Sequence, residues 1–198
     1  MTLTFLLTDI EGSTRLWEAH RQAMGQALAC HDRLVSQVVV DHGGRLVKAK
    51  GEGDSSFSVF TSPAQAVAAA LELQQALAAE PWPLPAPLAV RVAIHAGEVQ
   101  EREGDFYGPV VNRCARLRAI GHGGQVLLSA VAAELVRDDL PKGAYLRELG
   151  VHRLKDLAAP ERVVQLCHPD LRIPSTVRTG RVRSRIRPAP STAIITLW

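Results

Sequence analysis

The chain has 198 residues, 46% of them hydrophobic, with a formal net charge of +3 at pH 7. This length and composition suit one domain with a substantial core and are short for two. No stretch approaches the about 18 uncharged apolar residues of a membrane span, and we expect no secretory signal. The cysteines Cys30, Cys114 and Cys167 are widely spaced. Their spacing argues against a disulfide framework or a zinc site and favours a reducing cytoplasm.

The basic charge is concentrated at the C-terminus. Residues 172–198 contain six arginines, no lysine and no acidic residue, so residues 1–171 carry a net charge of −3. We therefore expect a mildly acidic domain over residues 1–170 and a basic, disordered tail over 171–198. The tail arginines lack interleaved aromatic residues, so we expect no specific nucleic-acid binding. A non-specific nucleic-acid binder acting through the tail stays an alternative.

Along the chain, strand-like and helix-like hydrophobic patterns alternate, which is typical of an α/β or α+β sandwich. The predicted strands are residues 2–8, 44–50, 55–60, 89–96, 125–128, 145–149 and 162–166. One long helix is expected to begin at Ser13 or Thr14 as its N-cap and to end at His42-Gly43-Gly44. Further helices are predicted for residues 63–79 and 109–120 and directly after Ser129. The runs 44–50 and 55–60 form a predicted hairpin.

Two acidic residues follow strand-like runs and open turns. Asp9 ends the first strand, and Asp54 closes the glycine-rich turn of the hairpin. If these strands are neighbours, both carboxylates meet at one edge of the sheet beside a helix N-terminus, which suits divalent metal and phosphate. Taken singly, each acid is better explained as ordinary turn chemistry.

The residues after Asp9 add main-chain groups to this predicted site. The carbonyl of Ile10 is a candidate further metal ligand. The N–H groups of Gly12, Ser13 and Thr14 lie at the predicted helix start, where they would face the phosphates of a nucleotide.

Lys50 and Asp105 together predict recognition of adenine. Adenine presents an acceptor at N1 and a donor at N6, whereas a lysine offers only donors and a carboxylate only acceptors. Guanine presents the reverse pattern at the same edge, so the pair would discriminate against it. Alone, Lys50 is more simply a solvated hairpin lysine, and Asp105 a loop acid.

Asn112 and Arg116 are four residues apart on a predicted helix and therefore share one face. Asparagine can orient a ribose oxygen, and the planar guanidinium of arginine can meet charge that develops on a phosphoryl group. An isolated pair of this kind is more often part of a solvated helix surface.

Taken together, these motifs resemble the class III nucleotidyl cyclases, the adenylyl and guanylyl cyclase catalytic domain. The resemblance rests on Asp9-Ile10-Glu11-Gly12-Ser13-Thr14, Lys50-x-x-Gly53-Asp54 and Asp105-x-x-Gly108-x-x-x-Asn112-x-x-x-Arg116, in this order. It extends from about Thr2 to Leu166 and includes Gly123–Ser129. All six family positions match in identity and spacing.

The resemblance implies an α+β fold with a ferredoxin-like βααββαβ sandwich core, a mixed sheet and helices packed on it. It implies an adenylyl cyclase that converts ATP to 3′,5′-cyclic AMP and pyrophosphate with two Mg²⁺ or Mn²⁺ ions per site. In this family the two acids, here Asp9 and Asp54, hold the metals, and Lys50 and Asp105 select adenine. Asn112 then orients the ribose, and Arg116 stabilises the transition state.

The family also implies a homodimer with shared active sites, in which one subunit supplies the metal acids and the other the remaining residues. A family lysine that contacts the triphosphate corresponds loosely to Lys155, because Asp156 stands where glycine usually follows. The arm between Val99 and Asp105 is shorter than in many members, as in some bacterial subgroups. Two alternatives remain: an ATP-binding regulatory module with little turnover, and a guanylyl cyclase, which Lys50 and Asp105 disfavour.

Overall fold

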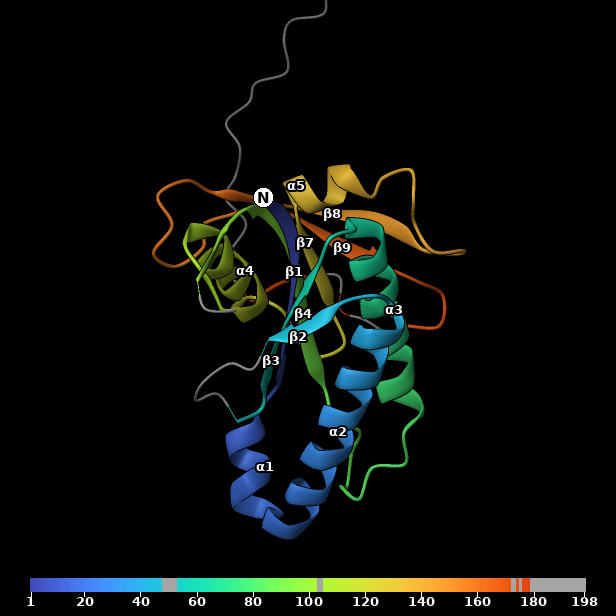
Figure 1. The fold of residues 1–198 in the computed structure, drawn as a ribbon. Helices are drawn as coiled ribbons and strands as arrows, with labels where there is room; N and C mark the ends of the chain where they lie inside the picture. The colour runs from blue at the N-terminus through green and yellow to red at the C-terminus, as the bar shows by residue number, and fades with distance from the viewer. Residues whose placement is uncertain (48–52, 103–104, 172–173, 175, 179–198) are drawn as a thin grey trace, which may run out of the picture.

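The computed structural model describes residues 1–47, 53–102, 105–171, 174 and 176–178 (Figure 1). The helices are α1 (Ser13–Ala19), α2 (Arg21–Asp41), α3 (Pro63–Ala79), α4 (Pro109–Ala119) and α5 (Ala130–Leu135). The strands are β1 (Thr2–Ile10), β2 (Arg45–Val47), β3 (Ser55–Phe60), β4 (Val90–Glu98), β5 (Gln100–Arg102), β6 (Asp105–Tyr107), β7 (Val126–Ser129), β8 (Tyr145–His152) and β9 (Glu161–Cys167). Among the described residues, no helix is both long and apolar enough to cross a membrane.

Seven strands form one mixed sheet in the order β2-β3-β1-β4-β7-β9-β8. The strand β1 runs antiparallel to both of its neighbours, β3 and β4, whereas β4 and β7 are parallel. A parallel pair needs a crossover connection, and the chain makes it through α4. The elements from β1 to β4 follow the order βααββαβ, so the predicted α+β core is confirmed.

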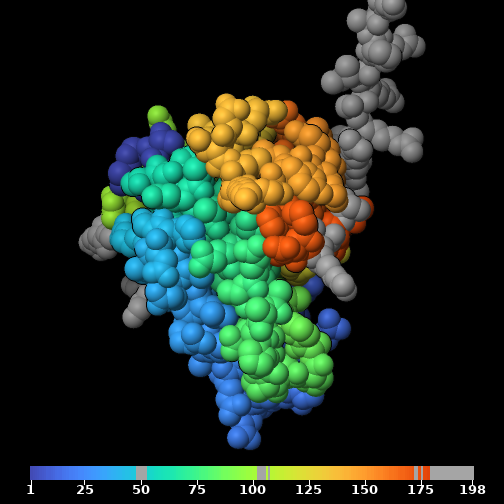
Figure 2. All heavy atoms as spheres, turned by 90° about the vertical axis from the view of Figure 1, so that its right-hand side faces the viewer, coloured from blue at the N-terminus to red at the C-terminus, as the bar shows by residue number. Residues whose placement is uncertain are grey.

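Helices cover both faces of the sheet, and the alternation of side chains along β1 explains how. Leu6 and Ile10 point into one core with α2 and α3, whereas Phe5 and Leu7 point into the other core with α4. Figure 1 shows α4 on one side of the sheet and α2 and α3 on the other. Figure 2 shows the face that α2 and α3 cover.

Most predicted elements are present, because their signals are local. Ser62 caps α3 by accepting a hydrogen bond from the N–H of Gln65 at 3.4 Å, and Pro63 occupies the first turn. Ser129 caps α5 by accepting from the N–H of Ala132 at 3.2 Å. The predicted hairpin is present as β2 paired antiparallel with β3.

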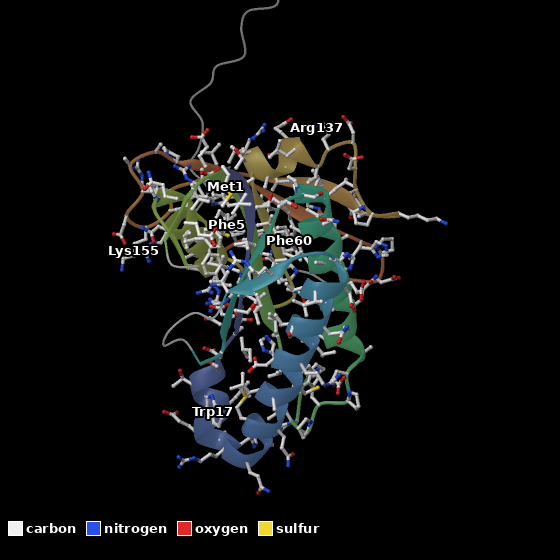
Figure 3. All side chains as sticks on the ribbon, in the orientation of Figure 1. Met1, Phe5, Trp17, Phe60, Arg137 and Lys155 are labelled. Carbon is white, nitrogen blue, oxygen red and sulfur yellow. The ribbon has the colours of Figure 1, made fainter. Side chains whose placement is uncertain are left out.

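The first predicted helix is wrong in its extent and in its cap. The helix divides at His20, where φ is −142°, into α1 and α2. The N-cap is Gly12, which has φ +72°, rather than Ser13 or Thr14. The division lets α1 turn back beside α2, so that the ring of Trp17 lies over Gly25 (Figure 3).

Part of the segment assigned to the tail packs on the domain. The side-chain amide of Gln125 donates to the carbonyls of Pro174 and Thr176 at 3.0 and 2.9 Å. The N–H of Arg178 donates to the carbonyl of Ile120 at 2.9 Å. The boundary at residue 171 stays a prediction, and beyond it Pro174, Thr176 and Arg178 contact the domain.

The loop before β7 holds the end of β1 through a close approach at Gly123. Its N–H donates to Oε2 of Glu11 at 2.9 Å, and a Cβ at this position would lie 2.3 Å from Cβ of Ala89 and 3.1 Å from its backbone carbon. We predict that Gly123→Ala lowers the free energy of unfolding by about 1–3 kcal/mol, because the backbone must move. Denaturant unfolding measures this change.

The matched control is Gly25→Ala in the interior of α2. A Cβ there comes no closer than 3.9 Å to the Trp17 ring, so the substitution should raise stability by up to about 1 kcal/mol through helix propensity. Equal effects of the two substitutions would contradict the packing described at Gly123.

Candidate active site

The two predicted metal acids lie at the ends of neighbouring strands. Asp9 pairs in register with Ser55 on β3, and Asp54 is the residue directly before Ser55. The side chain of Asp9 is only 12% exposed, and Asp54 is half-buried in the turn that leads into β3. The two carboxylates therefore belong to adjacent strand ends, as the sequence predicted.

Asp9 is held by two arginines on other elements. Arg91, its register partner on β4, donates from Nε to Oδ1 and from Nη2 to Oδ2, both at 2.6 Å. Nε of Arg118 on α4 lies 3.4 Å from Oδ2, and Nη1 of Arg118 donates to the carbonyl of Thr8 at 2.8 Å. The bidentate pair with Arg91 fixes the plane of the Asp9 carboxylate.

The donor set at this strand end fits a hard divalent cation. Each oxygen of Asp9 uses one lone pair on Arg91, which leaves further lone pairs for a ligand. Asp54 adds a second carboxylate at the neighbouring strand end, and Mg²⁺ is commonly bound by one or two carboxylates together with substrate phosphates. Ile10 has a buried side chain in the core, so only its carbonyl is available as a ligand.

The main-chain groups after Ile10 begin α1. The carbonyl of Gly12 accepts from the N–H groups of Arg15 and Leu16, so Gly12 starts the helix. The N–H groups of Ser13 and Thr14 lie in the first turn, where no intrahelical acceptor exists. Their predicted contact with phosphates stays a prediction.

The adenine-reading pair falls partly outside the described residues. Lys50 lies outside them, and of Asp105 only the backbone is described, paired with Arg102 in the two-stranded β5–β6 sheet. This sheet is anchored by Phe106, whose ring lies 5.8 Å from that of Phe5 and 6.3 Å from that of Phe57. These contacts place the backbone of Asp105 beside β3, and the predicted pairing of Asp105 with Lys50 stays a prediction.

The remaining predicted residues lie on and beside α4. Asn112 is exposed, and Arg116, one turn further along, is 41% exposed. Nη2 of Arg116 donates to Oδ2 of Asp156 at 2.8 Å. Asp156 directly follows Lys155, which is exposed at the edge of the molecule near α4 (Figure 3). The structure therefore brings Asn112, Arg116 and Lys155 to one side of α4.

The two groups of predicted residues lie on different sides of α4. Arg118 forms an ion pair with Asp9, whereas Arg116 forms one with Asp156. Residues two positions apart on an α-helix are rotated by about 200° about the helix axis, so these two side chains leave the helix in nearly opposite directions. Within one chain, Arg116 and Asp9 do not converge.

His95 is buried on β4 and contacts Ser129. Its ring is 6% exposed, and Nδ1 lies 2.7 Å from the hydroxyl of Ser129. Burial, together with the nearby charge of Arg113, lowers the pKa of His95 from 6.5 to about 4, so the ring is neutral at pH 7.

Comparison with known proteins identifies the family of the chain. The family described as the "Adenylate and Guanylate cyclase catalytic domain" matches residues 1–162. The chain belongs to this family. The cyclase domain thus covers every predicted site residue.

Related proteins and structures agree with this assignment. An uncharacterized protein of Mycobacterium tuberculosis is 45% identical over 171 residues, which cover 86% of this chain and 58% of that protein. The chain thus spans little more than half of its mycobacterial relative. A receptor-type adenylate cyclase of Trypanosoma equiperdum is 29% identical over 206 residues, covering 83% of this chain and 44% of that protein.

The fold of the cyclase domain matches solved structures of this family. One structure of adenylate cyclases from Trypanosoma brucei in their monomeric state has a TM-score of 0.79 and 27% identity, covering 91% of this chain and 94% of that chain. The structure of an adenylate/guanylate cyclase/hydrolase from Silicibacter pomeroyi has a TM-score of 0.74 and 27% identity. The match covers 83% of this chain and 95% of that chain.

Sequence reasoning missed three residues at this site. Arg91 was assigned to a strand, but its position opposite Asp9 depends on the register of β1 and β4. Arg118 lies in the predicted helix 109–120, but its contact with Asp9 depends on how α4 packs on the sheet. Asp156 was noted as a departure from the family pattern, and its contact with Arg116 depends on how the loop after β8 folds.

We predict that Arg91→Gln destabilises the cyclase domain by about 1–3 kcal/mol, because it leaves a mostly buried carboxylate without its bidentate partner. Chemical denaturation measures the change. The control Arg137→Gln breaks an ion pair whose members are 59% and 50% exposed, and should change the stability much less. If Arg91→Gln is no more costly than this control, the pair with Asp9 is not structural.

Proposed function

We propose that the chain is an adenylyl cyclase that converts ATP to 3′,5′-cyclic AMP and pyrophosphate at sites shared by two copies of the domain. The observation that carries the proposal is the placement of Asp9 and Asp54 at adjacent strand ends, with Asn112, Arg116 and Lys155 gathered on the other side of α4. Membership of the cyclase family supports the reaction class.

In the proposed reaction, the ribose 3′-hydroxyl attacks the α-phosphorus, the bond to the bridging oxygen breaks, and pyrophosphate leaves. Asp9 and Asp54 would hold Mg²⁺ or Mn²⁺, which when bound neutralises the triphosphate and lowers the pKa of the attacking hydroxyl. Arg116 would donate to the oxygens on which charge develops in the transition state. These contributions are positioning and electrostatic stabilisation, as in phosphoryl transfer generally.

The substrate contacts would come from the same side of α4 as Arg116. Asn112 would orient the ribose, and Lys155 would contact the triphosphate as a point charge. The loose sequence match at Lys155 gains support from the structure, because its neighbour Asp156 touches Arg116. The proposed preference for ATP rests on Lys50 and Asp105, and the packing of Phe106 beside the β2–β3 hairpin supports it.

The geometry of α4 supports a shared site. Within one chain, Arg118 pairs with Asp9 while Arg116, two positions earlier on α4, pairs with Asp156, so the two arginines serve different sides of the helix. A twofold axis would place the outer face of α4 of one copy against the strand ends of the other and create two equivalent sites.

The first test is cyclase activity of the purified chain. We predict that with Mn²⁺ and ATP it forms cyclic AMP, that Asp54→Ala lowers the rate at least about 100-fold, and that GTP is the poorer substrate. Product chromatography measures both nucleotides. No cyclic AMP above the Asp54→Ala level would favour a regulatory ATP-binding module, and faster turnover of GTP would refute the assignment of Lys50 and Asp105.

Complementation tests the shared site. Asp54→Ala and Arg116→Ala are each predicted to be inactive alone, because every site in either homodimer lacks one group. An equal mixture should recover about a quarter of the wild-type rate, since half of the dimers are mixed and each has one intact site. Absence of recovery, in chains shown by native mass spectrometry to form mixed dimers, contradicts the shared site.

A further inference from the structure

Asp156 has the backbone conformation that side chains other than glycine rarely adopt. Its φ is +61°, and among the described residues it is the only one other than glycine with a positive φ. It occupies the third position of the turn Leu154–Leu157, which the N–H of Leu157 closes by donating to the carbonyl of Leu154 at 3.3 Å. Glycine or asparagine is favoured where a turn requires positive φ at this position.

The turn is fixed by the core, so this conformation is imposed on Asp156. Leu154 is 1% exposed and belongs to the core under α4, and Leu157 packs against the same core. Both ends of the turn are therefore anchored, and the exposed residues Lys155 and Asp156 project from a rigid support. A disfavoured conformation that the surroundings impose is a reason to ask what the side chain does.

The side chain of Asp156 is paired with the arginine proposed to act on the transition state. Oδ2 of Asp156 accepts from Nη2 of Arg116 at 2.8 Å, and the two side chains are 59% and 41% exposed. Phosphate oxygens and a carboxylate compete for the same N–H groups of a guanidinium. A negative charge here also opposes the approach of a triphosphate.

We propose that Asp156 is a positioning residue that restrains the cyclase by holding Arg116 in an ion pair which the nucleotide must displace. The proposal rests on the function proposed above, and it adds a residue that lowers the rate of cyclic AMP formation. Because the pair is exposed, its effect is modest and is screened by salt.

The test compares two variants that keep the turn intact. Asp156→Asn removes the charge while retaining a residue tolerated at positive φ, and Asp156→Gly removes the side chain and relieves the backbone. We expect each to raise kcat/KM for Mn²⁺-ATP about two- to fivefold at low salt, which is the range that loss of one exposed ion pair allows. The gain should shrink toward onefold as NaCl rises to about 1 M.

Asp170→Asn is the matched control. It removes one acid that is 68% exposed and contacts Gln75 on α3 and His168, on the opposite face of the sheet from α4, and it should leave kcat/KM unchanged. Rates for Asp156→Asn equal to or below wild type, or a gain that salt does not reduce, would overturn the proposal. A purely structural role of the turn would give no such salt dependence.

A binding measurement separates this proposal from the proposed function. Titration calorimetry with inorganic tripolyphosphate should show about two- to fivefold tighter binding to Asp156→Asn than to wild type, whether or not either chain forms cyclic AMP. In the Arg116→Ala background the same substitution should change the affinity less than twofold. Unchanged affinity in the first comparison, or an equal gain in both backgrounds, shows that Asp156 does not act through Arg116.

Discussion

The antiparallel register of β1 between β3 and β4 is the constraint on which the rest of the site depends. It sets Asp9 opposite Ser55 on one side and opposite Arg91 on the other. A slip of one residue would turn Asp9 toward the apolar core under α2 and α3, where no arginine could meet it. The same register places Phe5 and Leu7 against α4, so the fold and the acid site are fixed by one set of backbone hydrogen bonds.

Features encoded over a few neighbouring residues could be predicted from the sequence. Local patterns predict the strand β1 and the helix starts after Ser62 and Ser129. They also predict that Asn112 and Arg116 share one face of a helix. The break at His20 was not predictable in this way, because the segment on either side has a helical pattern. The two helices pack against each other, with the ring of Trp17 near Gly25, and this packing cannot be read from the helical pattern.

Local patterns could not predict the contacts between distant segments, for the same reason. The pair of Arg91 with Asp9 joins residues 82 positions apart, and the pair of Arg116 with Asp156 joins residues 40 apart. The β5–β6 sheet was also missed, since each strand has three residues and is held by the ring of Phe106 more than by its own length. Sequence similarity supplied residue identities at the site, and the structure supplied their partners.

The charges around α4 differ between the inner and the outer side of the helix. Arg118 on the inner side places positive charge 3.4 Å from Oδ2 of Asp9, at the strand end next to Asp54. Arg116 on the outer side has its own counter-ion in Asp156. Each arginine is thus matched to an acid of its own chain in the isolated domain. A nucleotide bridging two copies would bring phosphate oxygens to Arg116 in exchange for Asp156, so substrate binding and domain pairing would act on the same ion pair.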